Sequence, residues 1–235
     1  LTGSTEWGEQ FADDLRKNAI AYLNVDGSTS GSKFDAGAIA SLNALVSQTV
    51  RDVKDPGAAG SVLDSWGRAL NSEVREATIG GGAAHETAAK RPIDYPGNAL
   101  GSGSDYTVFL NFLGLPIVEM SFNGPYGVYH SIYDNYYWMT HFGDPGFKYM
   151  TAMSEVWGRM ALRLANAEHY PHDFGIYAQR VGGFIDAMEA QPTVKGKLDF
   201  SRVRAETASW ANAATALEGA LRSTLGAAPS PARVK

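Results

Sequence analysis

A short apolar run directly after an amphipathic helix constrains the fold of this chain most. In the segment 4–18, Ser4 is a suitable helix N-cap, and large apolar side chains recur at every fourth residue from Trp7 to Leu15. The run AIAYLNVD follows at 19–26, and its composition favours a strand buried in a parallel sheet. A helix followed at once by a buried strand is the second half of a βαβ unit, which predicts an α/β fold.

The same two patterns continue further along the chain. We expect a short strand at 33–36, followed by a long helix whose apolar positions run from Ile39 to Val53. Another helix is expected from about Asp105. The run LPIVEMSF at 115–122 then predicts a second buried strand.

Two stretches lack these patterns. The segment 57–99 is poor in periodicity and rich in Gly, Ala and Pro, which predicts an irregular connection with one short helix. The segment 124–147 is dense in aromatic residues and predicts a loop with a short helix. Connections of this length inside compact domains are often functional.

Helical periodicity alone marks the last part of the chain. A long amphipathic helix is expected from Pro145 to about Ala167, with Asp144 as its cap and Pro145 in its first turn. The segments 177–190 and 199–225 are also helical, and no strand pattern separates them. The predicted domains are therefore an α/β domain at 1–170 and an all-α segment at 171–235.

Composition narrows the function classes. The chain has 235 residues, 44% of them hydrophobic, which is enough for a sizeable core. A net charge of -5 without a dense block of Lys and Arg argues against a nucleic-acid partner. The absence of cysteine excludes disulfides, thiolate metal sites and a Cys nucleophile. Any metal ion would have to be bound by His, Asp and Glu.

Asp26 and His130 are the candidate metal ligands. Asp26 follows a predicted strand, where open α/β sheets place their ligands, although a solvated turn-capping Asp beside Gly27 is an equally good interpretation. His130 lies among aromatic residues, with Asp134 four positions on. The alternative for His130 is a histidine hydrogen-bonded within a core or loop.

Other patterns are weaker. His169 and His172 have a helical spacing, but Pro171 between them favours a surface loop, and His85 and His141 have no acidic or His companion. The sequence GSGSD at 101–105 is suited to bind an anion before a helix, yet it lacks the Lys of a phosphate loop. The residues alone therefore supply two scattered candidate ligands and no complete catalytic set.

Several stretches, in order, resemble the family of co-catalytic zinc peptidases that includes glutamate carboxypeptidase II and the transferrin receptor. The similar stretches are GSTEW, YLNVDGSTSG, LGSGSDYTVFLNFLG, YGVYHSIYDNYY, DPGFKYMTAMSEVWGRMALRLAN and YAQRV. The resemblance covers nearly the whole chain and is weakest at 57–97 and beyond 190. It implies a partial doubly wound zinc-exopeptidase sheet, followed by the start of a helical dimerisation domain at 171–235.

The resemblance also implies a mechanism with two zinc ions per site. In the family, an Asp and a water bridge the two ions, and a Glu general base activates that water. Of the family's ligands, one Asp matches Asp26 and one His matches His130. The remaining ligands and the general base would lie before Leu1.

Further site residues follow from the same resemblance. Tyr129 matches a catalytic tyrosine that hydrogen-bonds the tetrahedral intermediate. Ser102, Gly103 and Ser104 match the segment that lines the substrate cleft, with Ser104 in place of the family's Asn.

Only some of the positions that determine substrate specificity in the family fall within this chain. The arginines that bind acidic residues in glutamate carboxypeptidase fall near Glu119 and Ser121, so the sequence does not predict acidic-dipeptide specificity. The family's Lys-Tyr pair for a C-terminal glutamate would lie beyond Lys235. Carboxypeptidase and aminopeptidase action both stay open.

We therefore expect a part of a zinc metallopeptidase that hydrolyses peptides or dipeptides and is inactive alone. Its expected partners are the missing N-terminal part of the same protein and a second copy in a homodimer. An extracytoplasmic or secreted location is expected from the family. The alternative is a non-catalytic, transferrin receptor-like binding or dimerisation module, against which the presence of Asp26 and His130 argues.

Overall fold

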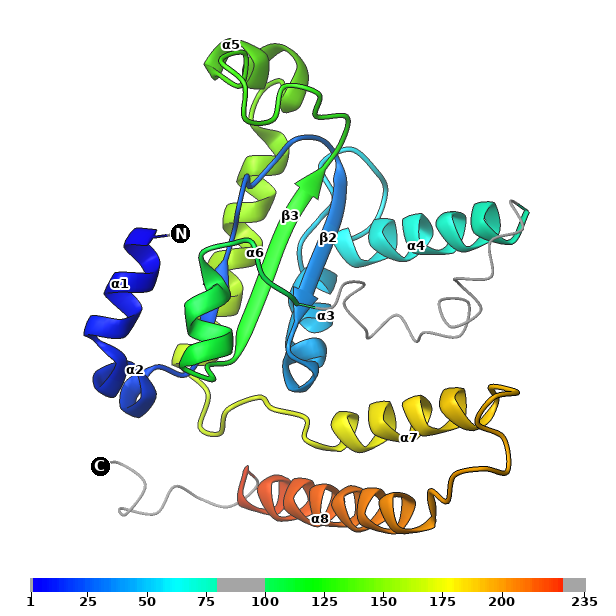
Figure 1. Cartoon of the computed structure of the whole chain (residues 1–235). Helices are drawn as coiled ribbons and strands as arrows, with labels where there is room; N and C mark the ends of the chain where they lie inside the picture. The colour runs from blue at the N-terminus through cyan, green and yellow to red at the C-terminus, as the bar shows by residue number, and fades with distance from the viewer. Residues whose placement is uncertain (1, 80–99, 226–235) are drawn as a thin grey trace. The chain divides into compact units, whose positions relative to one another are not determined.

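The computed structural model describes residues 2–79 and 100–225. The chain divides into two compact units, Leu1–Asn166 and Ala167–Lys235 (Figure 1). The first unit contains a mixed sheet and several helices, and the described part of the second unit contains helices without a strand. The expected α/β class is therefore confirmed.

The sheet has three strands in the order β1-β3-β2, and Figure 1 labels the neighbouring strands β3 and β2. Strand β1 (Tyr22–Asn24) runs parallel to β3 (Ile117–Asn123), as expected for buried runs joined by helices. Strand β2 (Lys33–Ala38) runs antiparallel to β3. The connection 25–32 contains no helix that would carry the chain back for a parallel strand, so the chain reverses direction.

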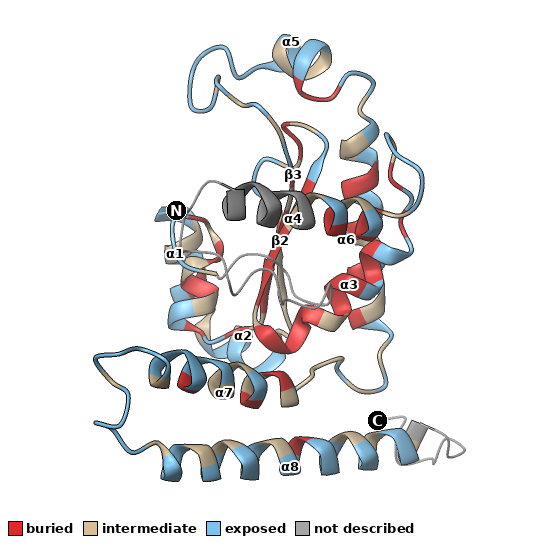
Figure 2. Ribbon diagram, turned by 90° about the vertical axis from the view of Figure 1, so that its right-hand side faces the viewer, coloured by how far each residue is buried: buried red, intermediate tan, exposed pale blue. Residues whose placement is uncertain are grey.

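One face of the sheet carries the larger core. The alternate residues Val118, Met120 and Phe122 of β3 are all buried on this face. They pack against residues of three helices, whose buried positions are red in Figure 2. These helices are α3 (Asn43–Arg51), α4 (Val62–Ile79) and α6 (Lys148–Ala165).

The opposite face carries a smaller core. Tyr22 of β1 and Ile117 of β3 pack there against the helical turn η3 (Val108–Phe112). The ring of Tyr22 stacks on that of Phe109 with centroids 4.3 Å apart. This second core covers the start of β1 and β3, and the polar residues Asn24 and Glu119 pair further along the same two strands.

The first helix differs from its expected form. It is broken into α1 (Thr2–Gln10) and α2 (Ala12–Asn18), because Phe11 leaves the helical conformation with a ψ of 19°. Ser4 lies inside α1 instead of capping it, and its hydroxyl donates to Oδ1 of Asp105 at 2.6 Å. The side chain of Ser4 therefore ties α1 to the loop before η3.

Helix α4 corrects the expectation of an irregular segment at 57–99. Its first turns bury Val62, Leu63 and Trp66 in the main core, a helical spacing that the surrounding Gly and Ala residues obscured. Asp64 accepts from the backbone N–H of Ser61 at 2.8 Å, which fixes the start of the helix. Residues 80–99, with His85, lie outside the described residues.

The helix after the aromatic segment begins later than its sequence indicates. Helix α6 starts at Lys148, after Phe147 in the left-handed conformation (φ 54°), so Pro145 lies before the helix. The capping role expected of Asp144 is nevertheless found, because its buried carboxylate accepts from the first backbone N–H groups of α6.

Two short helical elements complete the first unit. A 3₁₀ turn, η1 (Ala40–Leu42), precedes α3, so the helix expected from Ile39 to Val53 is present in two pieces. The aromatic segment contains α5 (Tyr136–Trp138) and the turn η4 (Met139–Gly143), as expected for a loop with a short helix.

The second unit pairs two helices, α7 (Gly175–Glu189) and α8 (Ser201–Leu225). Arg204 of α8 forms ion pairs with Asp186 at 2.7 Å and Glu189 at 2.6 Å, both on α7. The rings of Tyr177 and Trp210 stack at 5.7 Å. In the described parts of the chain, no helix is long and apolar enough to cross a membrane.

Candidate active site

Four polar side chains form a hydrogen-bonded group where β1 ends. The Ser104 hydroxyl donates to Oδ2 of Asp26 and accepts from Nδ2 of Asn24 at 3.0 Å. The Asn24 side chain also hydrogen-bonds to the carboxylate of Glu119. Ser104 and Asn24 are buried, with 8% and 4% of their surfaces exposed, whereas Asp26 is exposed. We call these four residues the Asp26 group.

The local backbone explains why these residues meet. Asn24 lies opposite Glu119 in the parallel register of β1 and β3, and Asp26 follows in the connection after β1. Ser104 stands in the loop before η3, where Gly103 takes a φ of 101° that a residue with a side chain rarely adopts. The carbonyl of Ser104 then accepts from the backbone N–H of Thr107 at 3.1 Å.

Electrostatics in the Asp26 group disfavour the charged form of Glu119. Partial burial raises the pKa of Glu119, and the negative charges of Asp26 and Asp35 raise it further. The hydrogen bond from Asn24 partly offsets this rise because it stabilises the carboxylate. The site therefore concentrates acidic groups at one edge of the sheet.

Tyr129 and His130 lie together in the segment that follows β3. Their rings stack with centroids 3.8 Å apart and an interplanar angle of 20°. His130 takes a φ of 58°, an uncommon conformation for a residue other than Gly, and 64% of the Tyr129 surface is exposed. Among the described residues, the imidazole of His130 has no hydrogen-bond or ion-pair partner, so its nitrogens stay accessible.

A tie across this segment holds the turn that contains His130. The Tyr126 hydroxyl donates to Oδ2 of Asp134. Burial and this hydrogen bond raise the pKa of Tyr126 to about 12, so the hydroxyl keeps its proton at neutral pH. The Tyr126 ring also contacts Tyr129 at 5.7 Å. Asp134 therefore hydrogen-bonds to Tyr126. Its spacing of four residues from His130 in the sequence is not evidence that Asp134 and His130 form a pair.

The sequence-predicted site residues form two pairs. Asp26 meets Ser104 after the end of β1, and Tyr129 meets His130 after the end of β3. Because β1 and β3 are parallel, both pairs follow carboxyl ends of strands, where α/β sheets place their ligands. Ser102 and Gly103 lie on the exposed part of the loop before Ser104.

The donor types of Asp26 and His130 suit zinc, which binds carboxylate oxygen and imidazole nitrogen. Even a catalytic zinc ion takes three protein ligands. Within residues 2–79 and 100–225, no group of three or more His, Cys, Asp or Glu side chains is arranged to hold a metal ion. Asp26 and His130 therefore have donor types that zinc binds, but the described residues do not by themselves complete a metal site.

Asn24 and Glu119 were not singled out as members of a common group by the sequence. The signal for Asn24 was a polar residue near the end of an apolar run, which also occurs in ordinary strands. Their pairing depends on the register between β1 and β3, and these two strands lie far apart in the sequence. Only the folded chain brings the two side chains together.

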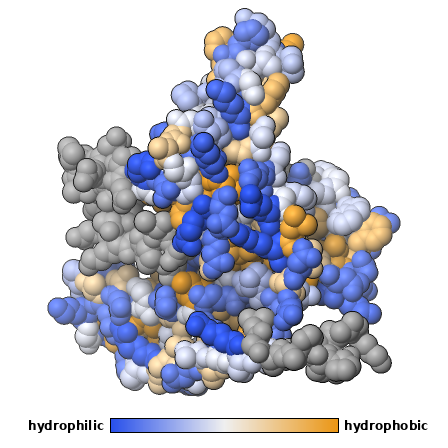
Figure 3. Space-filling view, turned by 180° about the vertical axis from the view of Figure 1, so that it is seen from behind, coloured by the Kyte–Doolittle hydropathy of each residue, from blue (hydrophilic) through white to orange (hydrophobic). Residues whose placement is uncertain are grey.

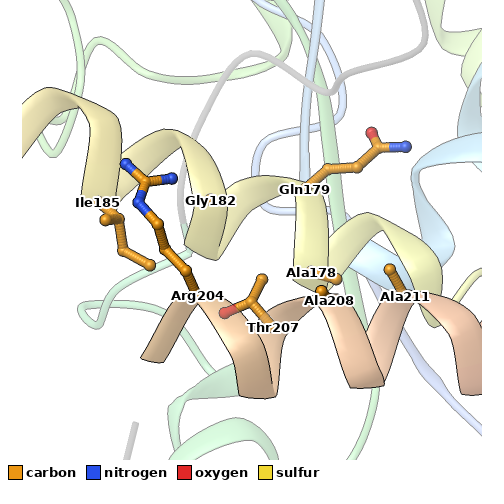
Figure 4. A pocket seen from close by; sticks show the side chains of 8 residues that line it. All are labelled: Ala178, Gln179, Gly182, Ile185, Arg204, Thr207, Ala208 and Ala211. Atoms are coloured by element: carbon orange, nitrogen blue, oxygen red, sulfur yellow. The ribbon is translucent and has the colours of Figure 1, made fainter. Parts of the chain in front are cut away.

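Two further surface features do not include the Asp26 group. The face opposite that of Figure 1 is mainly hydrophilic over α6, while apolar side chains reach the surface around α5 (Figure 3). In the second unit, a cavity of about 260 Å³ lies between α7 and α8, lined mainly by small or apolar side chains such as Ala178, Ile185 and Ala208 (Figure 4). The charged residue in its lining, Arg204, is engaged in ion pairs with Asp186 and Glu189.

Comparison with known proteins identifies relatives among the peptidases. The chain is 40% identical to the probable glutamate carboxypeptidase LAMP1 of Arabidopsis thaliana over 179 residues, which cover 76% of this chain and 23% of that protein. It is 34% identical to the probable glutamate carboxypeptidase VP8 of Zea mays over 191 residues, or 81% and 24% of the two chains. It is 27% identical to aminopeptidase NAALADL1 of Mus musculus over 199 residues, or 80% and 25%.

All three relatives are named as peptidases, and the matches cover 76%, 81% and 80% of this chain. No family model matches the chain. The chain nevertheless belongs to the glutamate carboxypeptidase-like family, as its sequence resemblance predicted. It spans about a quarter of the length of the curated relatives that it matches.

Proposed function

We propose that this chain is the C-terminal part of a di-zinc metallo-exopeptidase and that it contributes Asp26 and His130 to the metal site. The similarity to glutamate carboxypeptidases and to an aminopeptidase carries this proposal. The placement of both residues after the carboxyl ends of parallel strands supports it. The other ligands and the general base belong to sequence outside this chain, so the chain alone is inactive.

The two residues have defined tasks in the proposed site. Asp26 offers a carboxylate oxygen and His130 an imidazole nitrogen, which are donors that zinc accepts. Bound zinc would polarise the scissile carbonyl and activate a water molecule. Tyr129, stacked on His130 and largely exposed, would donate a hydrogen bond from its hydroxyl group to the oxyanion of the tetrahedral intermediate.

The proposed substrate is a peptide or dipeptide. Glu119 and Ser121, near the positions of the acid-binding arginines in glutamate carboxypeptidase, supply no positive charge to attract an acidic substrate side chain. We therefore propose that the enzyme prefers substrates with a neutral or basic residue, over those with an acidic residue, on the side of the scissile bond that faces Glu119. Ser102 and Gly103, on the exposed loop, line the proposed cleft.

The second unit is proposed as the start of a helical dimerisation domain. Its pair of helices presents exposed apolar side chains, among them Phe184 and Trp210. Large exposed apolar side chains favour association with another protein surface. A homodimer is the proposed assembly of the complete enzyme.

Zinc content and peptide hydrolysis of the longer protein that contains this chain test the proposal. His130→Ala and Asp26→Asn should each lower the zinc content and abolish hydrolysis of a dipeptide. His141→Ala, which changes an exposed histidine on η4, is the matched control and should leave both unchanged. Unchanged zinc content in the His130→Ala protein would overturn the assignment, and robust dipeptide hydrolysis by the present chain alone would overturn its proposed inactivity.

A further inference from the structure

We propose that Ser104 and Asn24 are positioning residues that fix the orientation of the Asp26 carboxylate. This inference rests on the proposed function because it assigns the two residues to a ligand of the proposed zinc site. It also changes the expected role of Ser104. A residue expected to contact substrate instead holds a metal ligand in place.

The direction of the hydrogen bonds carries the inference. An Asn side-chain nitrogen can only donate, so the Ser104 oxygen must accept from Asn24. A hydroxyl has a single proton, and the Ser104 proton is therefore directed at Oδ2 of Asp26. This arrangement occupies one carboxylate oxygen and leaves the other for a metal ion.

The partners of Asp26 are themselves held by the fold. The side chains of both Ser104 and Asn24 are buried, so water competes little for their hydrogen bonds. The Ser104 carbonyl accepts from the hydroxyl of Thr107 at 2.7 Å as well as from its backbone N–H. Asn24 is fixed in the strand register opposite Glu119. An exposed carboxylate is thus oriented by buried groups.

Such support is what a metal ligand requires from its surroundings. Hydrogen-bonding partners of a ligand fix its orientation, and their loss typically weakens metal affinity by about 10–100-fold. Asp26 is exposed, and without Ser104 its carboxylate would sample several rotamers. Ser104 therefore removes that freedom before the metal ion arrives.

A double-mutant cycle on the present chain tests the contact without metal. The cycle combines Ser104→Ala with Asp26→Asn, and urea unfolding measures the unfolding equilibrium constant of each variant. If Ser104 orients Asp26, the effect of Ser104→Ala should shrink by about tenfold once Asp26 is changed, because charged hydrogen bonds couple their partners. Independent effects of the two substitutions would overturn the inference.

Binding of Co²⁺ to the longer protein that contains this chain, monitored by its absorption spectrum, tests the consequence for a ligand. Ser104→Ala should weaken Co²⁺ binding by about 10–100-fold, while Ser104→Thr, which keeps the hydroxyl, should restore it. Ser102→Ala, in the exposed part of the same loop, is the matched control and should bind like the wild type. Equal affinity of the Ser104→Ala and wild-type proteins would overturn the inference.

The two measurements separate the inference from the proposed function. If Co²⁺ leaves the absorption spectrum of the longer wild-type protein unchanged while Ser104 and Asp26 are coupled in the present chain, Asp26 is not a ligand but is still positioned by Ser104. Co²⁺ binding that depends on Asp26 but not on Ser104 would support the proposed function and overturn the inference.

Discussion

Asn24 and Glu119 lie directly opposite each other on the parallel strands β1 and β3, and the Asn24 side chain hydrogen-bonds to the Glu119 carboxylate. The same Asn24 nitrogen donates to Ser104, whose hydroxyl donates to Asp26. One strand pair therefore links two carboxylates through neutral side chains. This linkage gives the candidate site a defined geometry at the edge of the sheet.

The raised pKa of Glu119 predicts a pH-dependent stability. In the unfolded chain Glu119 titrates near its ordinary pKa of 4.5, whereas burial and the charge of Asp26 raise its pKa in the fold. As pH rises above 4.5, the wild type should lose stability relative to Glu119→Gln, and this loss should level off above the folded-state pKa. Urea unfolding from pH 4 to 8 measures the difference, and parallel curves for the two proteins would contradict it.

The buried carboxylate of Asp144 should stabilise the start of α6. It accepts from the backbone N–H groups of Lys148 at 3.1 Å, Tyr149 at 3.2 Å and Met150 at 2.8 Å, and only 2% of the Asp144 surface is exposed. Asp144→Ala should lower the free energy of unfolding by about 2 kcal/mol or more, because buried donors lose their acceptor.

Urea unfolding of the first unit checks the prediction for Asp144. Glu155→Ala is the control, since Glu155 forms only an exposed pair with Arg159 and should change stability by less than about 1 kcal/mol. Equal effects of the two substitutions would show that Asp144 does not cap α6.

Packing on the sheet predicts a second contrast on α6. Met160 is fully buried in the main core, whereas 63% of the surface of its neighbour Leu162 is exposed. Met160→Ala should cost about 2–5 kcal/mol of unfolding free energy, while Leu162→Ala should change it by about 0.5 kcal/mol or less. Thermal and urea unfolding measure both, and a large loss from Leu162→Ala would indicate that its surface is covered in solution.

His172 predicts an acid-sensitive second unit. Burial lowers the pKa of His172 below its ordinary 6.5, because the fold disfavours the charged imidazole. Neutral His172 therefore contributes stability to the fold above pH 6.5, and this contribution should be lost as pH falls through the folded-state pKa of His172. Amide hydrogen exchange in α7 at pH 7 and pH 5 measures it, after correction for intrinsic exchange rates. His172→Gln should reduce the pH dependence, and an unchanged dependence would assign it to another group.

The apolar patterns predicted the positions of most elements. Strands β1 and β3 and the helix α6 contain runs that bury one face or both, so their periodicity is visible in the sequence. The direction of β2 was not predicted, because pairing depends on the chain reversal at 25–32 and on contact with β3. The break at Phe11 and the length of α4 likewise depend on packing.

The candidate site could be predicted only as separate residues. Asp26 was visible because it follows a predicted strand, and His130 because it lies among aromatic residues with Asp134 four positions on. The family resemblance added their roles. The contacts of Ser104 with Asp26 and Asn24 were not visible, since they join segments far apart in sequence through the left-handed turn at Gly103. Short sequence motifs carry no information on such long-range hydrogen bonds.

The most direct test of the central claim is the paramagnetic effect of Co²⁺ on the NMR spectrum of this chain. If Asp26 and His130 contribute to one metal site, substoichiometric Co²⁺ should broaden the resonances of both residues together, and His130→Ala should abolish the broadening at Asp26. Broadening confined to His169 and His172, or at neither candidate ligand, would contradict a shared metal site formed by Asp26 and His130.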